Sequence, residues 1–118
     1  MSDLTKVLEN FCRLDHVRGA LILDGHGFVL EESFNGQQES QALAELVLRA
    51  VQVGHSMVED LGKSPLTQQY IEFGDLQITA EQLSNAYVLV ILAESGANLG
   101  RVRLEIRKNR ASVEAMLT

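Results

Sequence analysis

The sequence predicts a single α/β domain of the α+β type, with a five-stranded antiparallel sheet between helices. Three observations predict it. The segment 88–93 (VLVILA) is apolar at every position, two β-prone pairs flank glycine-containing turns, and helical repeats occupy the start, middle and end. A strand that is apolar throughout is covered on both faces. The expected order is therefore α-β-β-α-β-β-β-α, with the long helix on one face and the terminal helices on the other.

Composition restricts the class of protein. A chain of 118 residues is long enough for one domain, so we expect 1–118 to form a single domain. Its hydrophobic content of 46% is that of an ordinary globular protein. No apolar run approaches the roughly 20 residues of a membrane span, and the start MSDLTKVLENF does not read as a signal peptide. Cys12 is the one cysteine, so no internal disulfide forms. We expect a cytoplasmic protein, and the net charge of −6 argues against a nucleic-acid partner.

The first element is a short amphipathic helix over 3–15, with Ser2 or Asp3 as its N-cap. Its apolar positions recur on one helical face. They are Leu4, Val7, Leu8, Phe11 and Leu14.

Two hairpins follow from glycine-containing turns between β-prone runs. The first joins 19–24 to 28–34, and the second joins 67–73 to 76–80. The segment 86–93 then completes an antiparallel meander as its buried central strand.

The longest helical pattern spans 39–62. The segment 62–65, which contains Gly62 and Pro65, ends this helix. One apolar stripe is Leu43, Val47, Ala50, Gly54, Met57 and Leu61, and the next is Ala44, Leu48, Val51, His55 and Val58. Together they are wider than the stripe of somewhat over 100° that covers a sheet. We expect one face to cover the sheet and another to meet a second protein surface, where Gly54 would allow close approach. The alternative is a helix enclosed within its own domain.

The last helix begins after Asn98, whose side chain can cap it. Its inward residues are predicted to be Leu99, Val102, Ile106, Val113 and Leu117, with Met116 beside them. Five basic residues fall on it: Arg101, Lys108 and Arg110 toward solvent, and Arg103 and Arg107 on its flank. The simplest interpretation is a solvated helix face that balances an acidic body.

The sequence contains few residue patterns that would indicate catalysis. Gly25-His26-Gly27 lies between two strands, whereas a phosphate loop needs a following helix, and no P-loop motif occurs. His16, His26 and His55 fall in separate elements without metal-ligand spacing. Spacing leaves open a Cys12 nucleophile with His16 or His55, but nothing favours it. We assign no catalytic, cofactor-binding or metal-binding residue.

The strand 67–73 (TQQYIEF) starts the meander and should lie at its edge. It has no lysine or proline to block pairing with another chain. We expect it to pair with its own copy about a two-fold axis, which would bring the two long helices together. The predicted dimer interface is Gln69, Tyr70, Ile71, Phe73, Ala50, Gly54 and Met57. The alternative is an edge covered by a loop.

The chain resembles the roadblock/dynein-light-chain family of the roadblock–longin superfamily, in its small bacterial or archaeal form. The motifs are 17–27 (VRGALILDGHG), the long central helix, 76–81 (LQITAE) and 92–103 (LAESGANLGRVR). The closing motif, in which Asn98-Leu99-Gly100 opens the last helix, is the most specific, and the resemblance covers essentially the whole chain.

The resemblance implies a two-layer roadblock/longin-like fold whose homodimers are non-enzymatic platforms for small Ras-like GTPases, as in dynein and lysosomal scaffolds. One bacterial branch promotes GTP hydrolysis by a cell-polarity GTPase without supplying an arginine finger. The predicted partner-binding residues come only from their place on the outer stripe of the long helix: Glu45, Arg49, Gln52 and Ser56.

Two alternatives remain open. The chain could be a structural subunit of a larger assembly, which would not accelerate GTP hydrolysis. It could instead be a small-molecule sensor or minor enzyme with a pocket between sheet and helices, which a ligand would stabilise against heating.

Overall fold

A computed structural model of the chain describes residues 3–36 and 40–117. Its elements are α1 (Asp3–Cys12), β1 (Val17–Leu23), β2 (Val29–Phe34), α2 (Ser40–Asp60), β3 (Gln68–Phe73), β4 (Leu76–Gln82), the 3₁₀ turn η1 (Ser84–Ala86), β5 (Val88–Glu94) and α3 (Leu99–Met116). The predicted order of helices and strands is confirmed. Of the two caps expected for the first helix, Ser2 lies outside the described residues.

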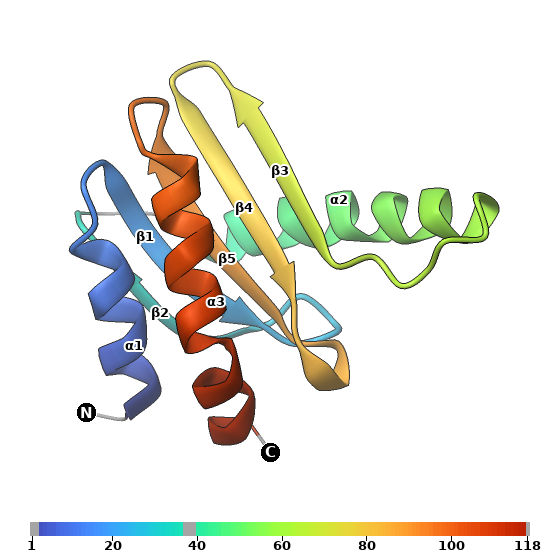
Figure 1. Ribbon diagram of the computed structural model, residues 1–118, viewed down its shortest axis with the longest axis horizontal. Coiled ribbons are helices and arrows are strands. Elements are labelled where there is room, and N and C mark those ends of the chain that lie inside the picture. The colour runs from blue at the N-terminus through green and yellow to red at the C-terminus, as the bar shows by residue number, and fades with distance from the viewer. Residues whose placement is uncertain (1–2, 37–39, 118) are drawn as a thin grey trace.

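The five strands form one antiparallel sheet in the order β2-β1-β5-β4-β3 (Figure 1). Strand β5 is central, and Val88 to Ala93 are all buried, as their apolar run predicted. The strand starts at Val88 and not at Ala86, because Asn85 and Ala86 adopt positive φ angles in η1. Strands β2 and β3 are the two edges of the sheet.

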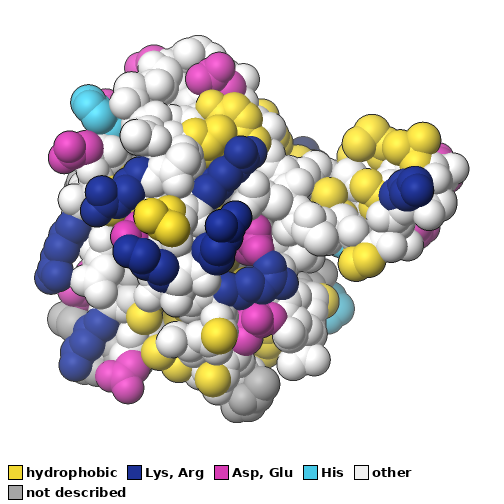
Figure 2. Space-filling model, viewed as in Figure 1, with side chains coloured by type: hydrophobic (Ala, Val, Ile, Leu, Met, Phe, Trp, Pro, Cys, Tyr) yellow, Lys and Arg dark blue, Asp and Glu magenta, His cyan; other side chains and the backbone are white. Residues whose placement is uncertain are grey.

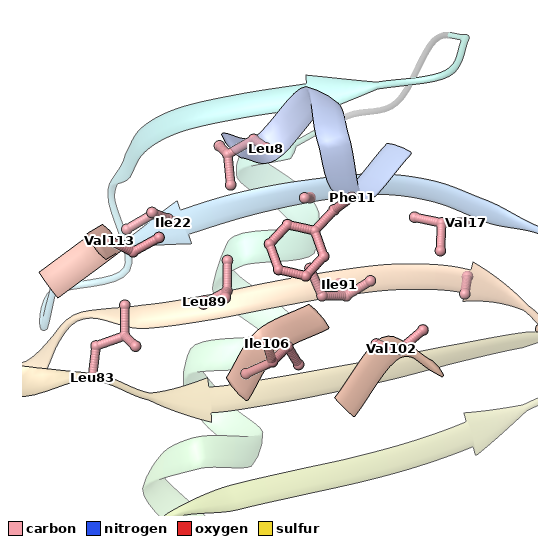
Figure 3. Close-up of a cluster of buried hydrophobic side chains, with 12 residues drawn as sticks. Leu8, Phe11, Val17, Ile22, Leu83, Leu89, Ile91, Val102, Ile106 and Val113 are labelled. Atoms are coloured by element: carbon pink, nitrogen blue, oxygen red, sulfur yellow. The ribbon is translucent and has the colours of Figure 1, made fainter. Parts of the chain in front are cut away.

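Helices cover both faces of the sheet, as predicted. Helices α1 and α3 lie on one face, over a core made of Leu8, Phe11, Val17, Ala20, Ile22, Leu83, Leu89, Ile91, Ala93, Val102, Ile106 and Val113 (Figure 3). Helix α2 lies on the other face, over Leu21, Leu23, Leu43, Ala44, Val47, Val51, Leu66, Ile78, Ala80, Val88, Val90 and Leu92. The two faces of each central strand therefore belong to two separate cores.

Local side-chain contacts fix the ends of the elements. The Asn98 side chain accepts a hydrogen bond from the backbone N–H of Arg101 at 3.1 Å, which confirms it as the N-cap of α3. In the β1–β2 turn, the Asp24 carboxylate accepts from the N–H groups of His26 and Phe28 at 2.8 and 3.0 Å. The predicted first hairpin thus has a turn closed by its own aspartate.

Helix α2 is longer than the sheet is wide. Its 21 residues extend about 31 Å at about 1.5 Å per residue, whereas five strands about 4.8 Å apart span about 19 Å. Figure 1 shows α2 crossing behind the sheet and continuing past β3. The C-terminal end of this helix therefore extends past the edge strand, whereas Leu43, Val47 and Val51 are buried against the sheet.

Candidate protein-interaction surface

The edge strand β3 presents different residues to the two faces of the sheet. The Gln69 amide donates to the Ala50 carbonyl of α2 at 3.0 Å, and Ile71 and Phe73 line a groove beside the same helix. On the opposite face, the Gln68 amide donates to the Glu81 carboxylate at 2.8 Å. The alternation of a strand places Tyr70 and Glu72 on that second face.

Helix α2 also carries an exposed apolar stripe. Its members Met57 and Leu61 were predicted as apolar positions of the helix, whereas Leu46 and Val53 were not. Leu46, Val53, Met57 and Leu61 are between 58% and 71% exposed. Figure 2 shows hydrophobic side chains gathered on the projecting end of α2. The signal was present in the sequence, because Leu46, Ala50, Val53 and Met57 follow the 4-3-4 spacing of one helical face.

A groove connects this stripe to the sheet edge. It has a volume of about 290 Å³ between α2 and the β3–β4 hairpin and is lined by Leu43, Leu46, Val47, Ala50, Ile71, Phe73, Leu76, Ile78 and Leu92. The α2–β3 surface, defined as Leu46, Val53, Met57, Leu61, Ile71 and Phe73, is therefore apolar from the helix to the edge. A contiguous exposed patch of this kind marks an interaction site.

The predicted interface residues fall into two groups. Met57, Tyr70, Ile71 and Phe73 are exposed, whereas Ala50 and Gln69 are half-buried and bound to each other. Gly54 is buried, and a Cβ there would lie 2.6 Å from the Gln69 amide nitrogen and 3.0 Å from Leu66. The structure thus corrects the reason given for this glycine: it allows α2 to approach its own chain.

The outer stripe of α2 is polar and faces away from the sheet. Glu45, Arg49, Gln52 and Ser56 are all exposed. Each precedes a member of the apolar stripe by one position, so the polar stripe runs alongside it on the side away from the sheet. Among the described residues, none of these four side chains forms an ion pair or hydrogen bond, which leaves them available to a partner.

The basic residues of α3 are not all equivalent. Figure 2 shows Lys and Arg side chains gathered over this helix. Arg101 and Lys108 each lie 3.8 Å from the Glu105 carboxylate. Arg110 was expected to face solvent, but it pairs with Glu114 and with the buried Glu81 of β4. The physical reason is that a buried carboxylate requires a nearby cation.

Replacing Arg110 by methionine is expected to lower the free energy of unfolding by about 1–3 kcal/mol. This is less than the 3–5 kcal/mol of a fully buried pair, because Arg110 is partly exposed. Urea denaturation measures the loss. Arg101→Met, which breaks only a surface pair, should cost less than about 1 kcal/mol. Equal losses in the two variants would contradict a structural role for the Arg110–Glu81 pair.

Cys12 and His16, which were considered as reactive side chains, each contact a neighbouring polar group. The Cys12 thiol donates to the Ser33 carbonyl at 3.2 Å, and burial raises the pKa of this thiol, which disfavours the thiolate. His16 lies 3.7 Å from the Glu94 carboxylate. Within residues 3–36 and 40–117, no three His, Cys, Asp or Glu side chains are placed to hold a metal ion. The helices of these residues lack the continuous apolar length of a membrane span.

The chain is similar in sequence and in fold to known proteins. Residues 4–93 match the family model of the Roadblock/LC7 domain. The chain is 24% identical over 115 residues to the uncharacterized protein MJ0714 of Methanocaldococcus jannaschii, covering 98% of this chain and 97% of that protein.

Among solved structures, Myxococcus xanthus MglB superposes with a TM-score of 0.89 at 18% identity, covering 99% of this chain and 96% of that one. An MglB with a tetrameric arrangement superposes with a TM-score of 0.86 at 20% identity, covering 98% and 90%. These two likenesses, at low identity, establish the fold alone.

Proposed function

Because the chain belongs to the Roadblock/LC7 domain family, we propose that it is a non-enzymatic homodimer that binds and regulates a small Ras-like GTPase. In this proposal it promotes GTP hydrolysis by ordering the catalytic groups of the GTPase, without an arginine finger of its own. The GTPase itself follows from the family resemblance. The surface of this molecule supports the dimer.

The observation that carries the proposal is the α2–β3 surface. Strand β3 has an open edge, and Ile71 and Phe73 beside that edge are exposed. Pairing two β3 edges about a two-fold axis would join two five-stranded sheets into one and bring the two α2 helices side by side. It would also cover Met57, which is 58% exposed. The tetrameric arrangement of an MglB with the same fold supports self-association.

The polar stripe of α2 is the proposed GTPase site. In such a dimer, Glu45, Arg49, Gln52 and Ser56 of both copies would lie on one face, away from the sheet. A surface with charged and amide groups at its rim suits a partner that binds reversibly. Each side chain is exposed and forms no hydrogen bond or ion pair with a described residue, so binding would not break an existing bond.

Pull-down with the Ras-like GTPases of the same organism tests the partner. Each GTPase is loaded with GDP or with a GTP analogue, and we expect at least one to be retained with a preference between the two. Retention of none would remove the GTPase from the proposal. A bound GTPase whose hydrolysis rate does not change would favour the structural-subunit alternative.

Arg49→Glu is expected to weaken GTPase binding about tenfold, which corresponds to about 1.4 kcal/mol. The charge reversal lies in the middle of the polar stripe, where a rim charge steers association. Isothermal titration gives the affinity, and light scattering should show an unchanged dimer. Arg13→Glu, an exposed arginine beyond the end of α1, is the matched control. Equal affinities of both variants would place the GTPase site elsewhere.

A further inference from the structure

A basic groove lies beside the β3 edge, on the face that carries α3. Its volume is about 410 Å³, and it is lined by Gln68, Glu81, Arg103, Ile106, Arg107 and Arg110. Gln68 belongs to the edge strand itself, so the groove opens next to the backbone that the proposed dimer uses. In such a dimer, side chains of the second copy would therefore lie close to this groove.

Two of the arginines in this groove have no acidic partner. Arg110 is neutralised by Glu81 and Glu114, but Arg103 and Arg107 are exposed and form no ion pair with any described residue. They are four positions apart on one helix, where like charges repel. Among the described residues, these two guanidinium groups are therefore a pair of positive charges without an acidic partner.

Glu72 is the complementary charge on the same face of the edge strand. It is exposed, and its carboxylate accepts a hydrogen bond from the Tyr70 hydroxyl at 3.2 Å. Desolvation and the Glu72 carboxylate raise the pKa of Tyr70, and the positive charge of Arg103 opposes them. Arg103 lies near this strand, because it lines the same groove as Gln68. No cation of the described chain forms an ion pair with Glu72.

Two-fold symmetry determines where Glu72 would lie in the dimer. An axis perpendicular to the sheet makes the paired edges antiparallel and keeps α3-facing residues on one face. The axis passes near the middle of the six-residue strand, at Tyr70 or at Ile71. Glu72 then lies opposite Gln68 of the second copy in the first case, or opposite Tyr70 of the second copy in the second. Gln68 lines the basic groove, and Tyr70 is two positions from Gln68 on the same face of the strand.

We propose that Glu72 of each copy enters the basic groove of the other and pairs with Arg103 and Arg107 there. The occupant of this groove is thus a second copy of this chain, and the inference rests on the proposed homodimer. Two symmetric contacts form per dimer. Because like-facing residues recur every second position, these contacts set the register in which the two β3 strands pair.

Charge reversal tests the pairing. Glu72→Arg, and separately the double variant Arg103→Glu/Arg107→Glu, should each raise the dimer dissociation constant at least about tenfold, because close interfacial charge pairs couple strongly. The triple variant, with all three charges reversed, should recover an affinity within about threefold of the unsubstituted chain. Analytical ultracentrifugation measures the constants at low salt, where electrostatic contacts are strongest.

Matched controls separate this contact from general charge effects. Glu32→Arg reverses an exposed acid on β2, the other edge strand, and Lys108→Glu reverses an exposed base on α3; both should leave the dissociation constant unchanged. An unchanged constant for Glu72→Arg, or a triple variant no tighter than either parent, would overturn the pairing while the dimer stands. A monomeric unsubstituted chain would instead contradict the dimer itself.

Discussion

Replacing Ile71 by aspartate is expected to convert the proposed dimer into a monomer with the 13.0 kDa mass of one chain. Ile71 is in the middle of β3, is 37% exposed and lines the apolar groove with Leu46 and Phe73. In the dimer, the new carboxylate would be buried without a partner, at a cost of about 3–5 kcal/mol. The dimer dissociation constant should therefore rise by a factor of about one hundred to a few thousand. Light scattering across a dilution series measures this change.

Leu30→Asp on β2 is the matched control for that prediction. Leu30 is 45% exposed on the opposite edge strand, so its substitution adds the same charge to an edge that the proposed dimer leaves free. We expect this variant to remain dimeric. A dimer that Leu30→Asp disrupts and Ile71→Asp leaves intact would show that the chain associates through β2.

The largest expected loss of stability follows from Phe11→Ala. Phe11 is buried and points from α1 toward Ile91 of the central strand (Figure 3). Removal of a buried phenyl ring costs about 3–5 kcal/mol through lost burial and the cavity that remains. Because domains of this size have unfolding free energies of about 5–15 kcal/mol, the variant should be close to unfolding at 37 °C. Urea denaturation at a fixed protein concentration measures the loss.

The fixed concentration matters because dimerisation also adds to apparent stability. Phe28→Ala provides the same substitution at a ring that is 62% exposed in the β1–β2 region, and it should cost about 0.5 kcal/mol or less. A loss below about 1 kcal/mol for Phe11→Ala would mean that α1 is not packed against the sheet as described.

Much of the fold could be predicted from the sequence because its determinants are local. The uninterrupted apolar run 88–93 identified the central strand, and Asn98 identified the start of α3 through a cap that spans only three residues. Glycines in the β1–β2 and β3–β4 turns identified both hairpins. Each of these features depends on neighbours within one or two turns of chain, so a residue pattern is enough to detect it.

The candidate surface was predicted less completely, because periodicity gives the faces of a helix but not the extent of the sheet beneath it. The wide apolar face of α2 indicated a second contact. That Leu46, Val53 and Met57 would be exposed depended on where the sheet edge falls. The Gly54 contact with Gln69, and the Arg110 contact with Glu81, join residues distant in sequence. No local pattern reveals pairs of this kind.

Light scattering coupled to size-exclusion chromatography, on the chain mixed with each Ras-like GTPase of its organism, tests the central proposal most directly. We expect the chain alone to elute with twice the 13.0 kDa chain mass. With one GTPase loaded with a GTP analogue, we expect a heavier species whose mass is two chains plus the bound GTPase. A chain that stays at 13.0 kDa at micromolar concentration, and forms no heavier species with any GTPase, would contradict it.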